Sequence, residues 1–369
     1  MNRLLRAWIA LACAGLAFGA AAQNAEPKVL NVYNWSDYIA DDTIANFEKE
    51  TGIKVRYDNY DSNEVLNAKL VAGSTGYDIV VPSAHFAKLQ LEAGLFRKLD
   101  RSKLTNWGNL DPALLEQMAK VDPGNQYLVD WAWGYVTVGI NTGKVKAALG
   151  SMAMPANPWD LIFKPEYASK LKGCGINVLD SPSEVLPIAM GYAGKPAYSR
   201  NAKDYDAARD VLAKARPFIT RFSSSGYIND LADGALCVVM GYSGDINIAR
   251  QRAIEAKNGQ DLEALIPPHG ATLFYDSMAI PKDAKHPNNA ELFINYMLRP
   301  EVSASITNKV FYANPTLPSR KFVKKSVAEN PTIFLSAADM KKLTPPDAVP
   351  QDIRRVQTRL FTSFKSGVR

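Results

Sequence analysis

The sequence predicts an α/β protein made of two doubly wound lobes. From Lys28 onward, short apolar strands alternate with amphipathic helices, which is the pattern of a mostly parallel sheet covered by helices. The run Ile79-Val80-Val81 is continuously apolar, as a strand buried on both faces should be. A β-rich run at 135–141 precedes a second alternating series, and 369 residues are comfortable for two domains.

The first lobe is expected to contain most of the early elements and to regain one strand late in the chain. Its strands are predicted at 29–33, 53–57 and 78–81, its helices at 41–50, 64–72 and 86–93, and its returning strand at 274–280. The second lobe, after the crossover at 135–141, has predicted strands at 175–178 and 235–240 and helices at 205–215 and 246–257. A helix at 289–298 and an amphipathic tail at 353–364 follow. We therefore expect lobe 1 at 28–135 plus about 276–305, and lobe 2 at 136–275 plus about 306–369.

Residues 1–22 are typical of a cleaved secretory signal. Arg3 and Arg6 form a basic start, an apolar run follows, and Ala20-Ala21-Ala22 offers a small-residue cleavage site. Cleavage would lower the formal net charge from +6 to +4, a mild excess spread along the chain. Such a surface favours solvated faces over nucleic-acid binding, so we expect an exported protein with no nucleic-acid partner.

Cleavage of the signal would remove Cys13 and leave two cysteines, Cys174 and Cys237, which lie 63 positions apart. In an oxidising compartment they most simply form one disulfide, which would stabilise the fold by about 4 kcal/mol in the chain-entropy model. Two buried free thiols are the alternative. Neither a CxxC pair nor a His-Cys spacing indicates a metal site, and we expect no metal and no cofactor.

Aromatic residues and carboxylates recur together in loops that follow predicted strands. The sets are Trp35, Asp37 and Tyr38, then Tyr242 and Asp245, then Phe274, Tyr275 and Asp276, and Glu184 opens a helix after a further strand. In α/β sheets the carboxyl ends of strands are where ligands bind. Converging carboxylates resist burial unless cations fill the site, and aromatic faces attract ammonium groups and cover methylenes. The pattern thus indicates a site for a polyvalent amine.

Other interpretations of these residues stay open. Trp35 and Tyr38 fit a core, Asp37 and Asp245 fit helix caps, and Ser181-Pro182-Ser183-Glu184 fits a capping box. Calcium also suits carboxylates, although ring faces are not its ligands. Paired carboxylates could serve an exported glycosidase, but no Ser/His/Asp arrangement, HExxH, Walker loop or GxGxxG is apparent, so we do not expect an enzyme.

The motifs resemble the periplasmic polyamine-binding proteins of bacterial ABC transporters, with the putrescine-binding members most similar. The resemblance extends from about Val29 to Gly367 and is carried, in family order, by Asn34-Trp35-Ser36-Asp37-Tyr38-Ile39, Val80-Val81-Pro82-Ser83-Ala84, Leu179 to Val185, Gly244-Asp245, Phe274-Tyr275-Asp276 and Phe311-Tyr312-Ala313-Asn314. It implies a two-lobed type II periplasmic binding protein, a Venus flytrap with the ligand between its lobes. It also implies a monomer that delivers putrescine to an inner-membrane permease. A preference for spermidine, or a sugar or iron ligand, is the alternative within the class.

The resemblance also implies roles for individual residues. Trp35, Tyr38, Phe274 and Tyr312 would cover the methylenes, Asp37, Glu184, Asp245 and Asp276 would hold the ammonium ends, and Ser36 and Ser83 would hydrogen-bond nearby. Cys174 and Cys237 look like positions bridged in relatives. Two positions depart from the pattern, since Tyr242 replaces a tryptophan and His85 replaces a small polar residue. We expect both in the pocket wall, with His85 making binding sensitive to pH near 6.5 if its pKa is unperturbed. A His85 side chain that points to solvent at the rim is the alternative.

Overall fold

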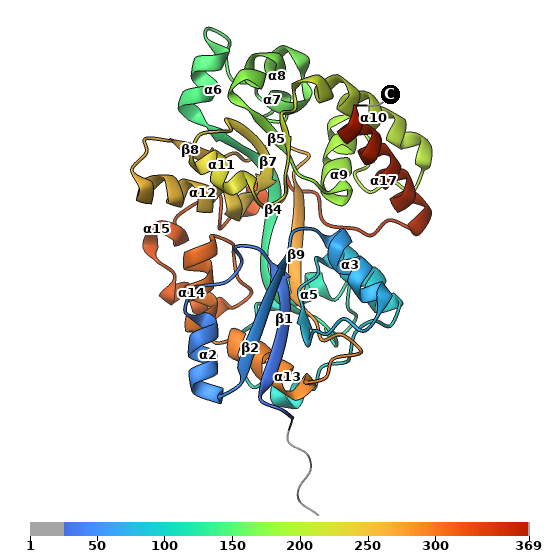
Figure 1. The fold of residues 1–369 in the computed structure, drawn as a ribbon, viewed down its shortest axis with the longest axis vertical. Helices are drawn as coiled ribbons and strands as arrows, with labels where there is room; N and C mark the ends of the chain where they lie inside the picture. The colour runs from blue at the N-terminus through green and yellow to red at the C-terminus, as the bar shows by residue number, and fades with distance from the viewer. Residues whose placement is uncertain (1–25, 368–369) are drawn as a thin grey trace, which may run out of the picture.

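The computed structural model describes residues 26–367, so the expected signal at 1–22 lies outside the described part of the chain. The described chain holds two sheets, one in each half of the molecule (Figure 1). We call the half with β1 to β3 the first lobe and the half with β5 to β8 the second lobe. This arrangement confirms the predicted α/β class and its two sheets flanked by helices.

The first lobe is built on a parallel sheet in the order β2-β1-β3. Its strands are β1 (Val29–Trp35), β2 (Lys54–Tyr60) and β3 (Ile79–Val80), and its early helices are α2 (Thr43–Thr51), α3 (Asn63–Ala72), α4 (Ala84–Glu92) and α5 (Pro112–Met118). Leu30, Val32 and Ile79 are fully buried, as their apolar pattern predicts. Strand β2 runs three residues beyond the expected end at 57, which brings Tyr60 and Asp61 to the edge where the strands end.

The second lobe is built on the strand order β6-β5-β7-β4-β8, in which β4 is Val129–Asn141. Its strands are β5 (Ile176–Val178), β6 (Arg221–Phe222), β7 (Val238–Tyr242) and β8 (Leu262–Ala264). Its helices are α6 (Thr142–Leu149), α7 (Asp160–Phe163), α8 (Pro165–Leu171), α9 (Pro182–Tyr192), α10 (Tyr205–Ala215), α11 (Tyr227–Ala232), α12 (Ser243–Ala256) and the tail α17 (Gln351–Ser366). Cys174 and Cys237 form a disulfide with Cα atoms 5.5 Å apart, and this bond lies within the second lobe.

Two long strands cross from one lobe to the other. Strand β4 (Val129–Asn141) pairs with β9 (Thr272–Met278) over Val129–Val136, and with β7 and β8 over its second half. The two strands run side by side through the middle of the molecule in Figure 1. Trp131 and Trp133 belong to β4, which begins at Val129, before the β-rich run predicted at 135–141. Ala279, directly after β9, forms a bridge with Val80 of β3, which returns the chain to the first lobe.

The remaining helices are α13 (Pro287–Met297), α14 (Pro300–Val310), α15 (Lys325–Ala328) and α16 (Ala337–Met340). Figure 1 shows α13 and α14 beside the first sheet and α17 in the opposite half. The residue boundaries of the lobes given above stay a prediction. Among residues 26–367, no helix is both long and apolar enough to cross a bilayer.

Candidate ligand-binding site

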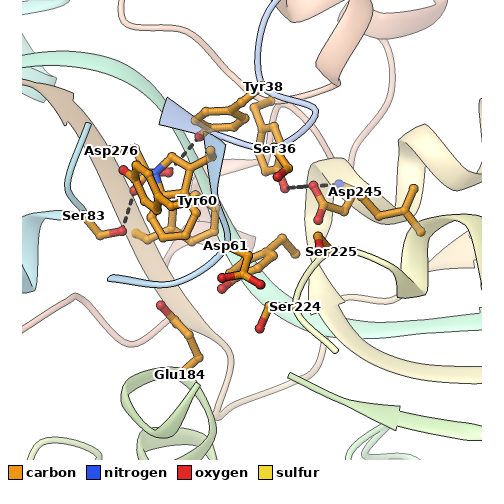
Figure 2. Close-up of a pocket in the computed structure, with 15 residues that line it drawn as sticks. Ser36, Tyr38, Tyr60, Asp61, Ser83, Glu184, Ser224, Ser225, Asp245 and Asp276 are labelled. Atoms are coloured by element: carbon orange, nitrogen blue, oxygen red, sulfur yellow. Dashed lines mark hydrogen bonds between the residues drawn. The ribbon is translucent and has the colours of Figure 1, made fainter. Parts of the chain in front are cut away.

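A cavity lies where the two lobes meet, at the ends of strands from both sheets. The space between its lining atoms is about 470 Å³, open solvent at its mouth included. Side chains from both lobes line it (Figure 2): Trp35, Ser36, Tyr38, Tyr60, Asp61, Ser83, Glu184, Ser224, Ser225, Ile228, Tyr242, Asp245, Phe274, Asp276 and Tyr312.

Asp276 is held on the first-lobe side of the cavity by two hydroxyl groups. The Tyr38 hydroxyl donates to Oδ2 at 2.9 Å and the Ser83 hydroxyl donates to Oδ1 at 2.5 Å (Figure 2). Asn63 in turn donates to Ser83 Oγ at 2.9 Å, which fixes the direction of the serine hydroxyl. Burial raises the pKa of Asp276 to about 7, because it disfavours the charged carboxylate. A cation bound beside Asp276 would favour the charged form again.

Asp245, in the first turn of α12, is the matching carboxylate on the second-lobe side. It accepts hydrogen bonds from the hydroxyls of Tyr312 at 2.6 Å and Tyr227 at 2.9 Å. The Tyr312 oxygen also accepts from the Asp245 backbone N–H at 3.1 Å, and Tyr227 Oη accepts from the Tyr242 N–H at 2.9 Å. Burial raises the pKa of Asp245 to about 7. The two aspartates therefore have the same design, a buried carboxylate held by two hydroxyl donors.

Two glycines let aromatic rings approach the backbone at this site. A Cβ at Gly244 would occupy the same space as the ring of Tyr312. A Cβ at Gly134, on β4, would lie 2.9 Å from both Phe274 Cζ and Tyr312 Cδ1. Larger residues at these positions would push Tyr312 away from Asp245. The contact with Tyr312 therefore explains why a glycine precedes Asp245.

Glu184 and Tyr242 present polar atoms that have no hydrogen-bond partner in the described part of the chain. Residue Glu184 is 5% exposed, and burial together with the charges of Glu64 and Asp276 raises the pKa of its carboxyl to about 8. The buried Tyr242 hydroxyl has no partner among the described residues. Buried polar groups are normally satisfied. A ligand that donates hydrogen bonds would supply what both groups lack.

Aromatic rings form the apolar walls of the cavity. Tyr38 and Tyr312 have ring centroids 5.0 Å apart, Phe274 and Tyr312 6.0 Å, and Tyr242 and Phe274 5.6 Å, all edge to face. Trp35 packs on Tyr60 at 4.6 Å and donates its indole N–H to the Val81 carbonyl at 2.9 Å. The arrangement places buried carboxylates among ring faces, which suits a ligand that combines ammonium groups with methylenes.

The structure brings ten of the predicted site residues to this cavity, namely Trp35, Ser36, Tyr38, Ser83, Glu184, Tyr242, Asp245, Phe274, Asp276 and Tyr312. It does not bring Asp37 there. Asp37 has a left-handed backbone with φ of 53°, which turns its side chain out of the cavity toward Arg252 on α12. The two side chains form an ion pair at 2.5 Å between the lobes.

His85 also lies elsewhere. It lines a separate groove between the lobes, together with residues of α3, α4 and α17. Burial lowers its pKa to about 4, because its environment disfavours the charged imidazolium. The prediction of a titration near 6.5 is therefore wrong, and the imidazole is neutral at neutral pH.

Sequence reasoning missed several residues of the site. Tyr60 and Asp61 line the cavity at the end of β2, where an aromatic residue again precedes a carboxylate. Tyr227 lies behind the cavity and holds Asp245. The signal for Tyr60 and Asp61 was present, but the strand was predicted to end at 57. Nothing in the local sequence links Tyr227 to Asp245.

The fold and the site together define an α/β solute receptor with its ligand site between two lobes. The chain belongs to the bacterial extracellular solute-binding protein family, which matches residues 42–334. It is a binding protein and not an enzyme.

Two relatives match over their whole length. The chain is 50% identical over 370 residues to the putrescine-binding periplasmic protein PotF of Escherichia coli and 49% identical over 368 residues to the putrescine-binding periplasmic protein SpuD of Pseudomonas aeruginosa, with 100% of each chain covered in both cases. A solved structure described as a putative spermidine/putrescine ABC transporter from Listeria monocytogenes superposes with a TM-score of 0.82 at 32% identity, covering 92% of this chain and 99% of the other.

Proposed function

We propose that this protein captures putrescine in the cavity between its lobes and delivers it to the inner-membrane permease of an ABC transporter. The observation that carries the proposal is the pair of buried aspartates, Asp245 and Asp276, each held by two hydroxyl donors on either side of an aromatic cavity. A linear diamine could place one ammonium against each carboxylate, and its methylenes could contact the aromatic rings that lie between the two carboxylates. The names of the two full-length relatives support putrescine as the diamine.

The energetics also favour a dication. An unpaired buried carboxylate is costly, and a hydrogen bond to a charged group contributes about 1.5–3 kcal/mol. A ligand with two ammonium groups satisfies both aspartates at once and is held in place by ring faces on its methylenes. We propose the ten cavity residues named above as ligand-binding residues, and we leave Asp37 and His85 out of the set.

A preference for spermidine is the second candidate, and one observation favours it. Glu184 is a third buried carboxylate at the cavity, and it has no hydrogen-bond partner within residues 26–367. A triamine could offer it a third ammonium. A relative from Escherichia coli named as a spermidine/putrescine-binding periplasmic protein is 33% identical over 333 residues.

Calorimetry of the exported protein with putrescine, cadaverine, agmatine and spermidine at pH 8 tests the proposal. We expect putrescine to bind most tightly. Butylamine is the matched control, because it keeps the four-carbon chain and loses one ammonium, and we expect it to bind at least tenfold more weakly. Tighter binding of spermidine would show that spermidine, and not putrescine, is the preferred ligand. Equal binding of butylamine would refute the two-carboxylate mechanism.

Export and assembly are part of the same proposal. We propose that residues 1–22 are removed after export to the periplasm, where the named full-length relatives reside, and that the mature chain is a monomer. Intact mass of the periplasmic protein checks cleavage after Ala22, and light scattering checks the oligomeric state.

A further inference from the structure

Glu64 is a carboxylate of the first lobe that makes its hydrogen bonds in the second lobe. It lies in the first turn of α3, outside the lining of the ligand cavity. Its Oε atoms accept from the Ser181 hydroxyl at 3.2 and 3.3 Å, and Oε1 accepts from the Ser183 backbone N–H at 3.2 Å. Figure 1 shows α3 in the lower half of the molecule, facing α9 across the junction of the lobes.

The start of α9 is incomplete without Glu64. The sequence predicts that Ser181 and Glu184 cap this helix reciprocally, but the Ser181 side chain makes no capping hydrogen bond to α9. Pro182 has no N–H, so the Ser183 N–H is the first backbone donor of the helix. Helix N-termini favour negative charge, and Glu64 supplies it from the opposite lobe. Separation of the lobes would leave these donors to water.

The capped residues stand directly beside the ligand cavity. Glu184 follows Ser183 in the chain and lines the cavity, so whatever fixes the first turn of α9 also fixes the Glu184 carboxylate. The charge of Glu64 also repels that of Glu184 and contributes to the raised pKa of Glu184. Closure of an empty protein therefore brings like charges together. A cationic ligand offsets this repulsion, and the cap formed by Glu64 is then available to hold the lobes closed.

We propose that Glu64 is a positioning residue that couples ligand capture to lobe closure, by capping α9 of the second lobe only when the cavity is closed. This inference rests on the proposed binding of a diamine. It deepens that function, because it assigns a role in affinity and residence time to a side chain that does not line the cavity.

The test uses Glu64→Ala in the full mature chain, with putrescine as the probe. We expect affinity to fall about tenfold or more, through faster dissociation rather than slower association. The melting temperature of the ligand-free protein should be unchanged, because the cap does not exist while the lobes are apart. Glu64→Gln keeps an acceptor oxygen for the Ser183 N–H and should recover part of the lost affinity.

Glu92→Ala is the matched control. Glu92 is an exposed glutamate at the end of α4 in the same lobe, and its side chain has no hydrogen-bond partner within residues 26–367. This variant should bind as the wild type does. Unchanged affinity and dissociation rate in Glu64→Ala would overturn the inference, as would an equal loss of stability in the ligand-free variant. Wild-type protein that bound no diamine would overturn the proposed function and this inference with it.

Discussion

Asp276→Asn removes one negative charge from the cavity and keeps the shape of the side chain. Asp276 accepts from Tyr38 at 2.9 Å and from Ser83 at 2.5 Å, so its oxygens are aimed and little reorganisation is needed when a ligand arrives. An asparagine amide would turn a donor toward one of these hydroxyls and would leave the ligand ammonium with a neutral partner. The cost is that of a charged hydrogen bond, about 1.5–3 kcal/mol, which corresponds to about 10- to 150-fold weaker binding.

Calorimetry with putrescine at pH 8 measures this loss, since Asp276 is then charged in the native protein. Asp130→Asn is the matched control. Asp130 is a buried carboxyl on β4, across from Ser277, and it does not line the ligand cavity. Burial raises its pKa well above the usual range, so the neutral amide resembles the form that its environment favours. We expect less than a twofold change for the control. An Asp276→Asn variant that bound within twofold of wild type would refute the role given to this carboxylate.

Three further outcomes are expected. Burial raises the pKa values of Asp245 and Asp276 to about 7 and of Glu184 to about 8, so these groups favour the folded, ligand-free protein at low pH and lose that contribution as pH rises through 7 and 8. The proposed binding of putrescine needs the charged forms, so the rise in melting temperature caused by putrescine should be larger at pH 8 than at pH 5.5, and an equal rise would contradict the assignment. Alkylation of the denatured, unreduced protein from which residues 1–22 have been removed should modify no thiol, because Cys174 and Cys237 are bonded; two labelled thiols would contradict this. Small-angle scattering should show a smaller radius of gyration with putrescine, and an unchanged profile would argue against closure about β4 and β9.

The sequence predicted most of the strand-end residues because one rule governs them. Strands that end at the same edge of a sheet bring their following residues together, and Trp35, Ser83 and Asp245 follow this rule. The same rule would have found Tyr60 and Asp61. The polar residues of 58–60 hid the end of β2, because this stretch lacks the apolar alternation by which strands are recognised.

Other features depend on geometry that a single sequence does not reveal. Asp37 is adjacent to two cavity residues, yet its left-handed backbone sends its carboxylate to Arg252. Ser181 and Glu184 satisfy a capping pattern that a residue more than a hundred positions away fulfils instead. In each case the side chain bonds to a partner in the other lobe, Arg252 for Asp37 and Glu64 for Ser181. A local sequence pattern carries no information about such distant partners.

Strand β4 has a consequence for the independence of the two lobes. Its first half pairs with β9 and its second half pairs with β7 and β8, so a single continuous strand belongs to both halves of the molecule. A cut before β4 would separate the first sheet from β4 and β9, and a cut after β4 would deprive β7 and β8 of a partner. Exposed strand edges invite aggregation. Neither half should therefore be obtainable as a separate folded module, and insertion of a reporter domain should succeed in surface loops such as 258–261 rather than at the junction of the lobes.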